Sequence, residues 1–357
     1  MNEATSAIQP VIALDAMGGD VGPDVVVAGA ELALQRNPDL RFRIFGQEAP
    51  LREAMARAPK AAAASETVFV EGVVLGTDKP SQAIRRARTT SMGLAVDAVK
   101  TGAASACVSA GNTGALMAMA KLALRTMDGI ERPALVALMP TLKSESVVLD
   151  LGANTECDAE NLVQFAVMGA AFARTVLGLE RPRVAFLNIG EEEMKGTEEI
   201  RDAANLLRAA GADLPLQFIG NVEGNGIAEG LSDVIVTDGF SGNIALKTAE
   251  GTARLVGGLL ERAFRQSIFT KAGYLLARPA FRSMKQHLDP NNHNGAVFLG
   301  LNGVVVKSHG GANIPGFANA IRVARDLVVK DIHARIDADM ANFTAHRREK
   351  QAAAGAV

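Results

Sequence analysis

Residues that could bind an anion occur in short glycine-rich loops, and the stretch TDGFSGN at 237–243 is the clearest example. It follows an apolar run at 233–236 that is typical of a buried strand. We expect Ser241 or Asn243 to cap a helix that begins near Ile244. Such a loop directs backbone N–H groups and the positive end of a helix dipole at one point, where phosphate is stabilised. Taken alone, the loop fits an ordinary strand–helix turn better.

Similar loops follow other apolar runs, and their recurrence strengthens the interpretation. They contain DAMGGD at 15–20, SAGNTGA at 109–115, DLGAN at 150–154, NIGEEEMKG at 188–196, GNVE at 220–223 and KSHG at 307–310. In open α/β sheets, ligands bind outside the carboxyl ends of the strands. Loops that share one rim of the sheet would therefore form one pocket from Asp15, Asn112, Asn154, Lys195, Asn221, Asp238, Asn243 and His309. The pattern favours an enzyme for a phosphorylated or anionic ligand, and no loop matches a P-loop or a dinucleotide fingerprint.

Strand-like and helix-like runs alternate along the chain, which predicts an α/β fold with a mostly parallel sheet in a three-layer αβα sandwich. Strands are expected at 11–14, 41–46, 67–70, 105–108, 134–139, 146–151, 183–189, 216–219, 233–236 and 303–307. One helix is expected to span 81–101. We expect a single large domain over 1–345, with a helical insertion at about 255–290 and a flexible tail at 346–357.

The composition excludes several functional classes. The chain has 357 residues, a net charge of −2, one Tyr and no Trp, so neither charge nor stacking residues indicate a nucleic-acid partner. Two cysteines fit a reducing cytoplasm. No metal-ligand spacing, secretory signal pattern or apolar run of 18 residues is present, so we expect neither a metal nor a membrane span.

The segment 262–288 differs from the rest because it is basic and apolar at once. Its six basic residues, with no acidic one among them, are Arg262, Arg265, Lys271, Arg278, Arg282 and Lys285. Apolar residues such as Phe269, Leu275 and Leu276 lie between them, a composition that suits an anionic membrane surface. A helical hairpin in a dimer interface fits equally well. Gly273 and Pro279 predict at most two short helices.

The ordered set of loops resembles one family. The motifs DAMGGD, SAGNTGA, DLGAN, NIGEE, DGFSGN and KSHG, in this order over residues 11–328, are similar to those of the bacterial phosphate acyltransferases (PlsX). The resemblance implies transfer of a fatty acyl group from acyl carrier protein to inorganic phosphate, giving acyl phosphate for phospholipid synthesis. It also implies a fold like those of isocitrate dehydrogenase and phosphotransacetylase, a homodimer, and peripheral attachment to the cytoplasmic face of the membrane. The sequence departs from the family at 291–295 and 311–313, so His293 and Asn313 are not assigned to the site.

Phosphate is itself a nucleophile, so this reaction requires no triad, covalent intermediate or cofactor, only positioning and oxyanion stabilisation. We assign Lys195 as the cation, Asn243 as a hydrogen-bond donor and His309 as a general acid for the leaving thiol. An exposed loop lysine and a plain helix cap are the alternatives for the first two. The expected phosphate- and substrate-binding residues are Asp15, Gly18, Gly19, Asp20, Ser109, Gly111, Asn112, Thr113, Gly114, Asn154, Asn221, Glu223, Asp238, Gly239, Ser241 and Gly242.

Arg85, Arg86 and Arg88 are expected to dock the acidic carrier protein, although a solvated helix face explains them nearly as well. Two other functions remain open. A metal-dependent NAD dehydrogenase of the isocitrate or isopropylmalate type would need clustered aspartates and arginines, where these loops offer asparagines and glycines. A non-catalytic module that binds acyl phosphate or carrier protein would use the same loops without turnover.

Overall fold

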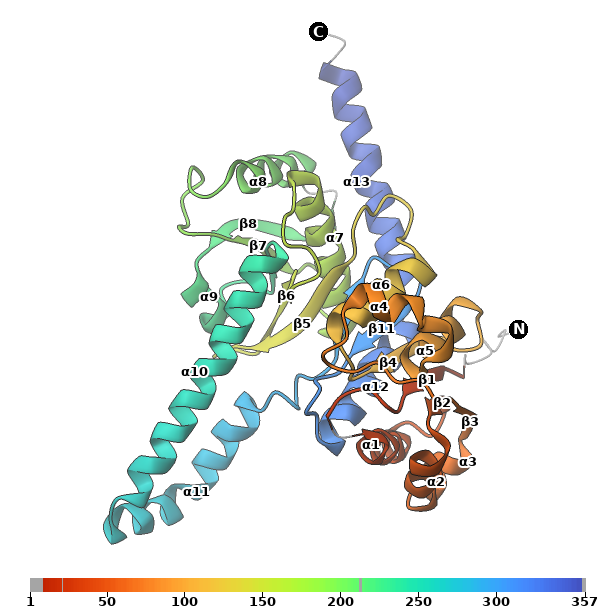
Figure 1. Ribbon diagram of the computed structural model, residues 1–357. Helices are drawn as coiled ribbons and strands as arrows, with labels where there is room; N and C mark the ends of the chain where they lie inside the picture. The colour runs from red at the N-terminus through yellow and green to blue at the C-terminus, as the bar shows by residue number, and fades with distance from the viewer. Residues whose placement is uncertain (1–8, 21, 212–213, 355–357) are drawn as a thin grey trace, which may run out of the picture.

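The structure, a computed structural model, describes residues 9–20, 22–211 and 214–354, with side chains to residue 345. In these residues eleven strands form one sheet in the order β3-β2-β1-β4-β11-β10-β5-β6-β9-β7-β8 (Figure 1). The strands are β1 Val11–Asp15, β2 Arg41–Gly46, β3 Ser65–Phe69, β4 Ala106–Ser109, β5 Ala134–Pro140, β6 Glu145–Leu149, β7 Arg183–Leu187, β8 Gln217–Val222, β9 Val234–Val236, β10 Ala296–Leu299 and β11 Val304–Lys307. The predicted strands are all present, and β10 is the one that the sequence did not indicate.

Strand direction divides the sheet into two halves. Strands β3, β2, β1, β4 and β11 are parallel, and so are β6, β9, β7 and β8. Between them, β10 is antiparallel to both neighbours, and β5 is antiparallel to β6. The second half therefore runs opposite to the first. We call the edge formed by the carboxyl ends of β1, β4 and β11 the first rim, and the edge formed by the carboxyl ends of β6, β9, β7 and β8 the second rim. Because the two halves run in opposite directions, the two rims lie at opposite ends of the strands.

Helices cover both faces of the sheet, which confirms the predicted three-layer sandwich. The first face carries α1 Gly22–Arg36, α2 Glu48–Ala56, α3 Pro59–Ala63, α7 Ala159–Val176, α8 Glu198–Ala210, α12 Ile314–Val329 and α13 Ile332–Ala354. The second carries α4 Pro80–Arg85, α5 Ser91–Lys100, α6 Thr113–Leu124, α9 Gly224–Glu229 and the start of α10 Gly239–Arg265. Side chains alternate between the two cores as the strand period requires: Ile12 and Leu14 face the first and Ala13 the second.

Helix α7 is the most deeply buried helix, and its small residues explain how it fits. A Cβ at Gly169 would lie 2.7 Å from Val234 and 2.8 Å from Leu149, so only glycine allows this approach to the sheet. Phe165 and Phe172, four residues before and three after Gly169 on this helix, are fully buried in the same core.

The single helix predicted over 81–101 is wrong. The region forms α4, a 3₁₀ turn at Ala87–Thr89, and α5. Thr90 adopts an extended backbone and its hydroxyl accepts a hydrogen bond from Gly93 N at 3.3 Å, so it caps a new helix. Gly93 allows the start of α5 to pack closely against the 3₁₀ turn, because a Cβ at this position would lie 2.0 Å from Ala87 O.

Helices α10 and α11 Ile268–Leu288 form a long hairpin that projects away from the sheet (Figure 1). Two predictions about it are corrected. Helix α10 begins at Gly239 because Asp238, not Ser241 or Asn243, accepts the capping bond from Ser241 N at 2.8 Å. Helix α11 is continuous through Gly273 and Pro279, and the chain turns at Gln266 and Ser267 instead. No helix among the described residues is both long and apolar enough to cross a bilayer.

The C-terminal region expected as a tail from 346 stays helical to Ala354, and residues 355–357 lie outside the described part of the chain.

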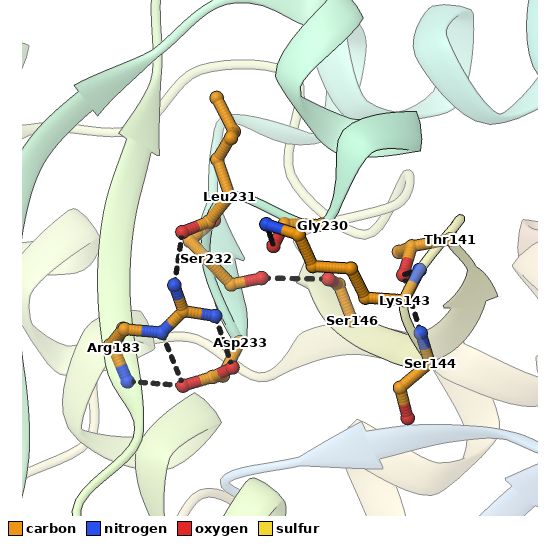
Figure 2. A network of polar contacts seen from close by, with 9 residues as sticks. All are labelled: Thr141, Lys143, Ser144, Ser146, Arg183, Gly230, Leu231, Ser232 and Asp233. Atoms are coloured by element: carbon orange, nitrogen blue, oxygen red, sulfur yellow. Dashed lines mark hydrogen bonds and ion pairs between the residues drawn. The ribbon is translucent and has the colours of Figure 1, made fainter.

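A polar network ties the amino ends of β6, β7 and β9 together (Figure 2). Arg183 forms a bidentate ion pair with Asp233 through Nη2 at 2.8 Å and Nε at 3.1 Å, and its Nη1 donates to Leu231 O at 2.8 Å. Ser146 Oγ donates to Ser232 O at 2.7 Å. These contacts fix the order β6-β9-β7, and they lie opposite the second rim.

Candidate active site

Three polar residues form a row across the first rim. Asp15 ends β1, Ser109 ends β4 and Lys307 ends β11, and the strand register pairs Asp15 with Ser109 and Ser109 with Lys307. Ser109 Oγ donates to Asp15 Oδ2 at 2.7 Å. Burial raises the pKa of the Asp15 carboxyl, and the hydrogen bond from Ser109 opposes that shift. The parallel strands thus bring a carboxyl, a hydroxyl and an amine to one line.

Glycines let the loops beyond this row pack against one another. A Cβ at Gly18 would lie 2.6 Å from Asp15 Oδ2 and 2.7 Å from Gly111 N. Gly19 has φ of +88°, and a Cβ there would lie 2.8 Å from Gly310 O. Asp20 N donates to Gly310 O at 2.9 Å, which joins the loop after β1 to the loop after β11. The close approach leaves backbone rather than side chains at this surface.

Lys307 was quoted in the KSHG motif but not predicted as a site residue. Its half-buried side chain donates from Nζ to Ala110 O at 3.1 Å and to Ser308 O. Burial, and then the charge of Lys247 on α10, lower the pKa of Lys307 to about 8, while Asp15 and Asp20 act in the opposite direction.

His309 follows Lys307 by two residues and lies at the same rim. Its backbone N donates to Asn294 Oδ1 at 2.8 Å, and Asn294 Nδ2 donates to Ser308 Oγ at 2.8 Å. The buried Asn294 therefore positions the His309 loop, while the His309 side chain is exposed. The sequence did not identify Asn294, because it resembles the other asparagines in loops. Only its burial distinguishes it, and that burial results from its position just before β10, a strand that the sequence did not indicate.

Asn112, predicted to bind substrate, is occupied by structural contacts. Its Oδ1 caps α6 by accepting from Ala115 N at 2.9 Å, and its Nδ2 donates to Gly76 O at 2.8 Å. Thr113 and Gly114 form the first turn of that helix, whose amino end faces the first rim.

The second rim is organised by Asp150, which follows β6. Its buried carboxylate accepts hydrogen bonds from five donors: Leu135 N, Gly152 N, Ala153 N, Asn154 N and Asn154 Nδ2, at 2.7–3.2 Å. Burial raises the pKa of Asp150, and these donors oppose the shift. Gly239 N donates to Asn154 O at 2.7 Å, so the start of α10 is held against this loop. Burial and the nearby carboxylates of Asp150 and Asp238 also raise the pKa of the Cys157 thiol to about 12, which makes it a poor nucleophile.

The remaining predicted residues also lie at the second rim. Lys195 is exposed at the tip of a loop that Asn188 holds together, since Asn188 Nδ2 donates to Lys195 O at 3.0 Å. Asn221 Nδ2 donates to Glu192 O in the same loop, at 3.2 Å. Asn243 is exposed in the first turns of α10, next to Gly152. Glu223, Ser241 and Gly242 belong to the starts of α9 and α10.

The expectation that all these loops share one rim is therefore wrong. The first rim gathers Asp15, Gly18, Gly19, Asp20, Ser109, Gly111, Asn112, Thr113, Gly114 and His309, and the second gathers Asn154, Lys195, Asn221, Glu223, Asp238, Gly239, Ser241, Gly242 and Asn243. The β5–β6 hairpin separates the two groups because it reverses the direction of every strand that follows in the sheet.

The fold matches solved phosphotransacetylases. The EutD phosphotransacetylase from Staphylococcus aureus superposes with a TM-score of 0.60 at 17% identity, covering 89% of this chain and 94% of that one. A phosphotransacetylase from Streptococcus pyogenes has a TM-score of 0.60 at 19% identity, covering 90% and 94%. The chain thus has the phosphotransacetylase type of fold.

Its sequence relatives are more specific. Residues 11–335 match the family described as "Fatty acid synthesis protein". The phosphate acyltransferase of Erythrobacter litoralis is 60% identical over 335 residues, and that of Rhodospirillum centenum 56% over 334, each covering 94% of both chains. The chain belongs to this phosphate acyltransferase family and is an acyltransferase enzyme. The resemblance drawn from the motifs is confirmed, and neither the dehydrogenase nor the non-catalytic module is favoured.

A glycine pair tests whether loop packing at the first rim matters for catalysis. Gly19→Ala and Gly102→Ala both place a side chain at positive φ, but a Cβ at Gly102 meets nothing within 4 Å. We expect both to lose about 1 kcal/mol of unfolding free energy from the positive φ, and Gly19→Ala to lose more, because its Cβ would lie 2.8 Å from Gly310 O and 2.9 Å from Ala110 Cβ. Only Gly19→Ala should also lower kcat/KM, by about tenfold or more, because it displaces the Gly310 loop. Equal activity of the two variants, measured beside urea unfolding, would contradict a catalytic role for this packing.

Proposed function

We propose that the enzyme transfers a fatty acyl group from acyl carrier protein to inorganic phosphate and so supplies acyl phosphate for phospholipid synthesis. The observation that carries the proposal is the row of Asp15, Ser109 and Lys307 beneath glycine loops, in a chain of the phosphate acyltransferase family. Backbone N–H groups, a hydroxyl and an ammonium are groups that hold a phosphate dianion.

The chemistry requires a site that holds phosphate, donors for the oxyanion and an acid for the leaving thiol. A phosphate oxygen attacks the thioester carbonyl carbon, and the carbonyl oxygen becomes an oxyanion that N–H and amine donors stabilise. The C–S bond then breaks, the acyl group remains on phosphate, and the thiolate of the carrier leaves. We assign His309, which is exposed at the first rim, to protonation of that thiolate. No metal or nucleotide takes part in these steps.

Phosphate-dependent release of carrier thiol from acyl carrier protein tests the reaction directly. We expect one thiol per acyl phosphate formed, and unchanged turnover after treatment with EDTA. Loss of turnover that a divalent ion restores would contradict the metal-free mechanism, and thiol release that does not depend on phosphate would contradict the reaction itself.

The same assay tests the donor, because Arg85→Glu with Arg88→Glu should raise the KM for acyl carrier protein but not that for phosphate.

These two arginines are better placed for docking than the third. All three are exposed, but Arg86 Nη2 is paired with Asp78 Oδ2 at 2.6 Å, whereas Arg85 and Arg88 have no ion-pair partner among the described residues. Asn112 Nδ2 also bonds to Asp78 O at 3.3 Å, so this segment is joined to the loop after β4. A carrier bound to these arginines would therefore deliver its acyl group close to the first rim.

A homodimer is the second part of the proposal. Four apolar side chains along α10 are at least half exposed: Phe240, Ile244, Leu255 and Leu259. Their spacing, with Thr248 and Gly251 between them, makes one stripe on the helix. Such a stripe suits packing against the same stripe of a second copy. Asn243 lies on this helix beside the stripe, so dimer formation would bring this second-rim residue near a partner chain.

Lys195 and Asn243 remain our assigned cation and donor, although one chain holds them at the second rim. We expect Lys195→Ala and Asn243→Ala each to lower turnover by about 100-fold with the fold intact, as loss of an oxyanion donor does. Glu191→Ala, in the same exposed loop as Lys195, is the control and should keep wild-type turnover. A normally folded Lys195 or Asn243 variant that retains most activity would remove that residue from the mechanism.

The tip of the hairpin is proposed to bind an anionic membrane surface without spanning it. Phe269 is 84% exposed and Leu276 85%, with Leu275 beside them. The six basic residues of the segment are all exposed, and only Arg265 has an ion-pair partner within the described chain, Glu261. Each charge near an anionic leaflet contributes about 1 kcal/mol, and inserted apolar surface adds roughly 25 cal/mol per Å². The apolar tail of the product gives this attachment a purpose.

Two double variants separate the membrane from the dimer. Leu275→Glu with Leu276→Glu should leave a dimer that no longer co-sediments with anionic liposomes. Leu255→Glu with Leu259→Glu should weaken the dimer, seen by analytical ultracentrifugation, while the tip residues stay intact. Dissociation of the dimer by the first pair, together with wild-type protein that never binds liposomes, would contradict the membrane proposal and assign the tip to the dimer interface.

A further inference from the structure

The turn at residues 75–78 is held firmly although it lies on the surface. Leu75 N donates to Asp78 Oδ2 at 3.0 Å, and Asp78 N donates back to Leu75 O at 3.1 Å, so the turn closes on itself. The Asp78 carboxylate also pairs with Arg86 Nη2 at 2.6 Å. These bonds fix the backbone of the turn and the position of its first residue, Leu75, whose side chain is 59% exposed.

Asn112 fastens this turn to the first rim. Its Nδ2 donates to Gly76 O at 2.8 Å and to Asp78 O at 3.3 Å, both within the turn. Its Oδ1 accepts from Ala115 N at 2.9 Å and so caps α6. One side chain therefore has two separate tasks, because its oxygen starts the helix and its nitrogen holds the turn.

The turn joins the two places that the proposed reaction has to connect. On one side, Asn112 follows Ser109, a member of the polar row, by three residues. On the other side, the turn leads into α4, which ends at Arg85 and is followed closely by Arg88. Leu75 is thus an exposed apolar side chain in the segment that links the carrier-docking arginines to the row.

We propose that Leu75 contacts the pantetheine arm on which the carrier protein bears its acyl thioester, and that Asn112 is a positioning residue that holds the turn where this contact forms. The inference rests on the proposed function, because it names the part of the carrier that meets the enzyme beside the arginines. The arm is long and flexible, so ordering it on binding costs entropy, and a rigid apolar contact offsets part of that cost. The arginines attract the acidic carrier, and Leu75 receives the arm that leads from it.

Two thioesters separate the arm from the protein that bears it: decanoyl carrier protein and decanoyl-pantetheine. Leu75→Ser should raise the KM for both by about fivefold or more, because the apolar contact belongs to the arm. Arg85→Glu with Arg88→Glu should raise the KM for decanoyl carrier protein alone. The KM for phosphate should stay near wild type in every case. Leu122→Ser is the matched control, since Leu122 is 66% exposed at the far end of α6, and it should leave both thioester KM values unchanged.

Asn112→Asp tests the positioning role without removing the helix cap. Aspartate keeps an oxygen that accepts from Ala115 N and caps a helix as well as asparagine does, but it has no N–H to donate to Gly76 O and Asp78 O. We expect urea unfolding close to that of wild type, together with the same rise in both thioester KM values as in Leu75→Ser. The double variant should be little worse than either single variant, because both changes remove one contact.

Wild-type KM values for both thioesters in Leu75→Ser would overturn the proposal, and so would a rise confined to decanoyl carrier protein, which would place the contact on the protein. Fully additive effects of Leu75→Ser and Asn112→Asp would overturn the positioning role.

If wild-type enzyme does not turn over decanoyl-pantetheine, the inhibition constant of this thioester against decanoyl carrier protein replaces its KM. Absence of inhibition would equally contradict the proposal. A changed sedimentation coefficient of Leu75→Ser would assign the turn to a contact between copies of the chain instead. Failure of the proposed function looks different, since wild-type protein itself would then show no phosphate-dependent thiol release.

Discussion

The antiparallel pairing of β5 with β6 determines where every functional loop of this enzyme lies. Ala137 pairs with Val148 and Pro140 with Glu145 in a tight hairpin, so the chain reverses direction within the sheet. Every strand beyond β6 then runs opposite to β1, β4 and β11. The loop that follows a strand lies at the carboxyl end of that strand. Because the β5–β6 hairpin reverses the direction of the strands, the glycine-rich loops are divided between the two rims.

Each rim is organised by a buried carboxylate at the end of a strand. Asp15 receives the Ser109 hydroxyl and Met17 N at the first rim, and Asp150 receives five N–H donors at the second. Burial of such a group is costly unless its oxygens are hydrogen-bonded, so each loop is fixed in the one shape that supplies those donors. Glycine at 18 and 239 lets the backbone approach each carboxylate closely. The rims thus share a construction although they carry different chemistry.

The base of the α10–α11 hairpin is anchored to the same β5–β6 turn. His287 Nε2 lies 2.9 Å from Thr141 O, and His293 Nδ1 lies 2.5 Å from Glu145 Oε1. The hydrogen bond between the latter two raises the pKa of His293 and lowers that of Glu145. The contribution of His293 to stability is therefore complete below its unfolded pKa and lost as pH rises through the raised folded value, whereas that of Glu145 is lost only as pH falls through its lowered value. A projecting hairpin with few core contacts gains a fixed direction from this pair.

The sequence by itself determined the elements, the class of fold and the family. Apolar runs and glycine punctuation place ten of the strands and most helices because those signals are local, and the ordered motifs identify the acyltransferase family because six short patterns rarely coincide. Local signals failed to predict three helix boundaries correctly: Thr90 starts a new helix, Asp238 caps α10, and α11 continues through Pro279. Only the tertiary structure decided which loops meet, because strand direction depends on pairing between distant segments and on β10, whose four residues give no periodic signal. That pairing placed Lys307 in line with Asp15 and Ser109, and it moved Lys195 and Asn243 to the other side of the sheet.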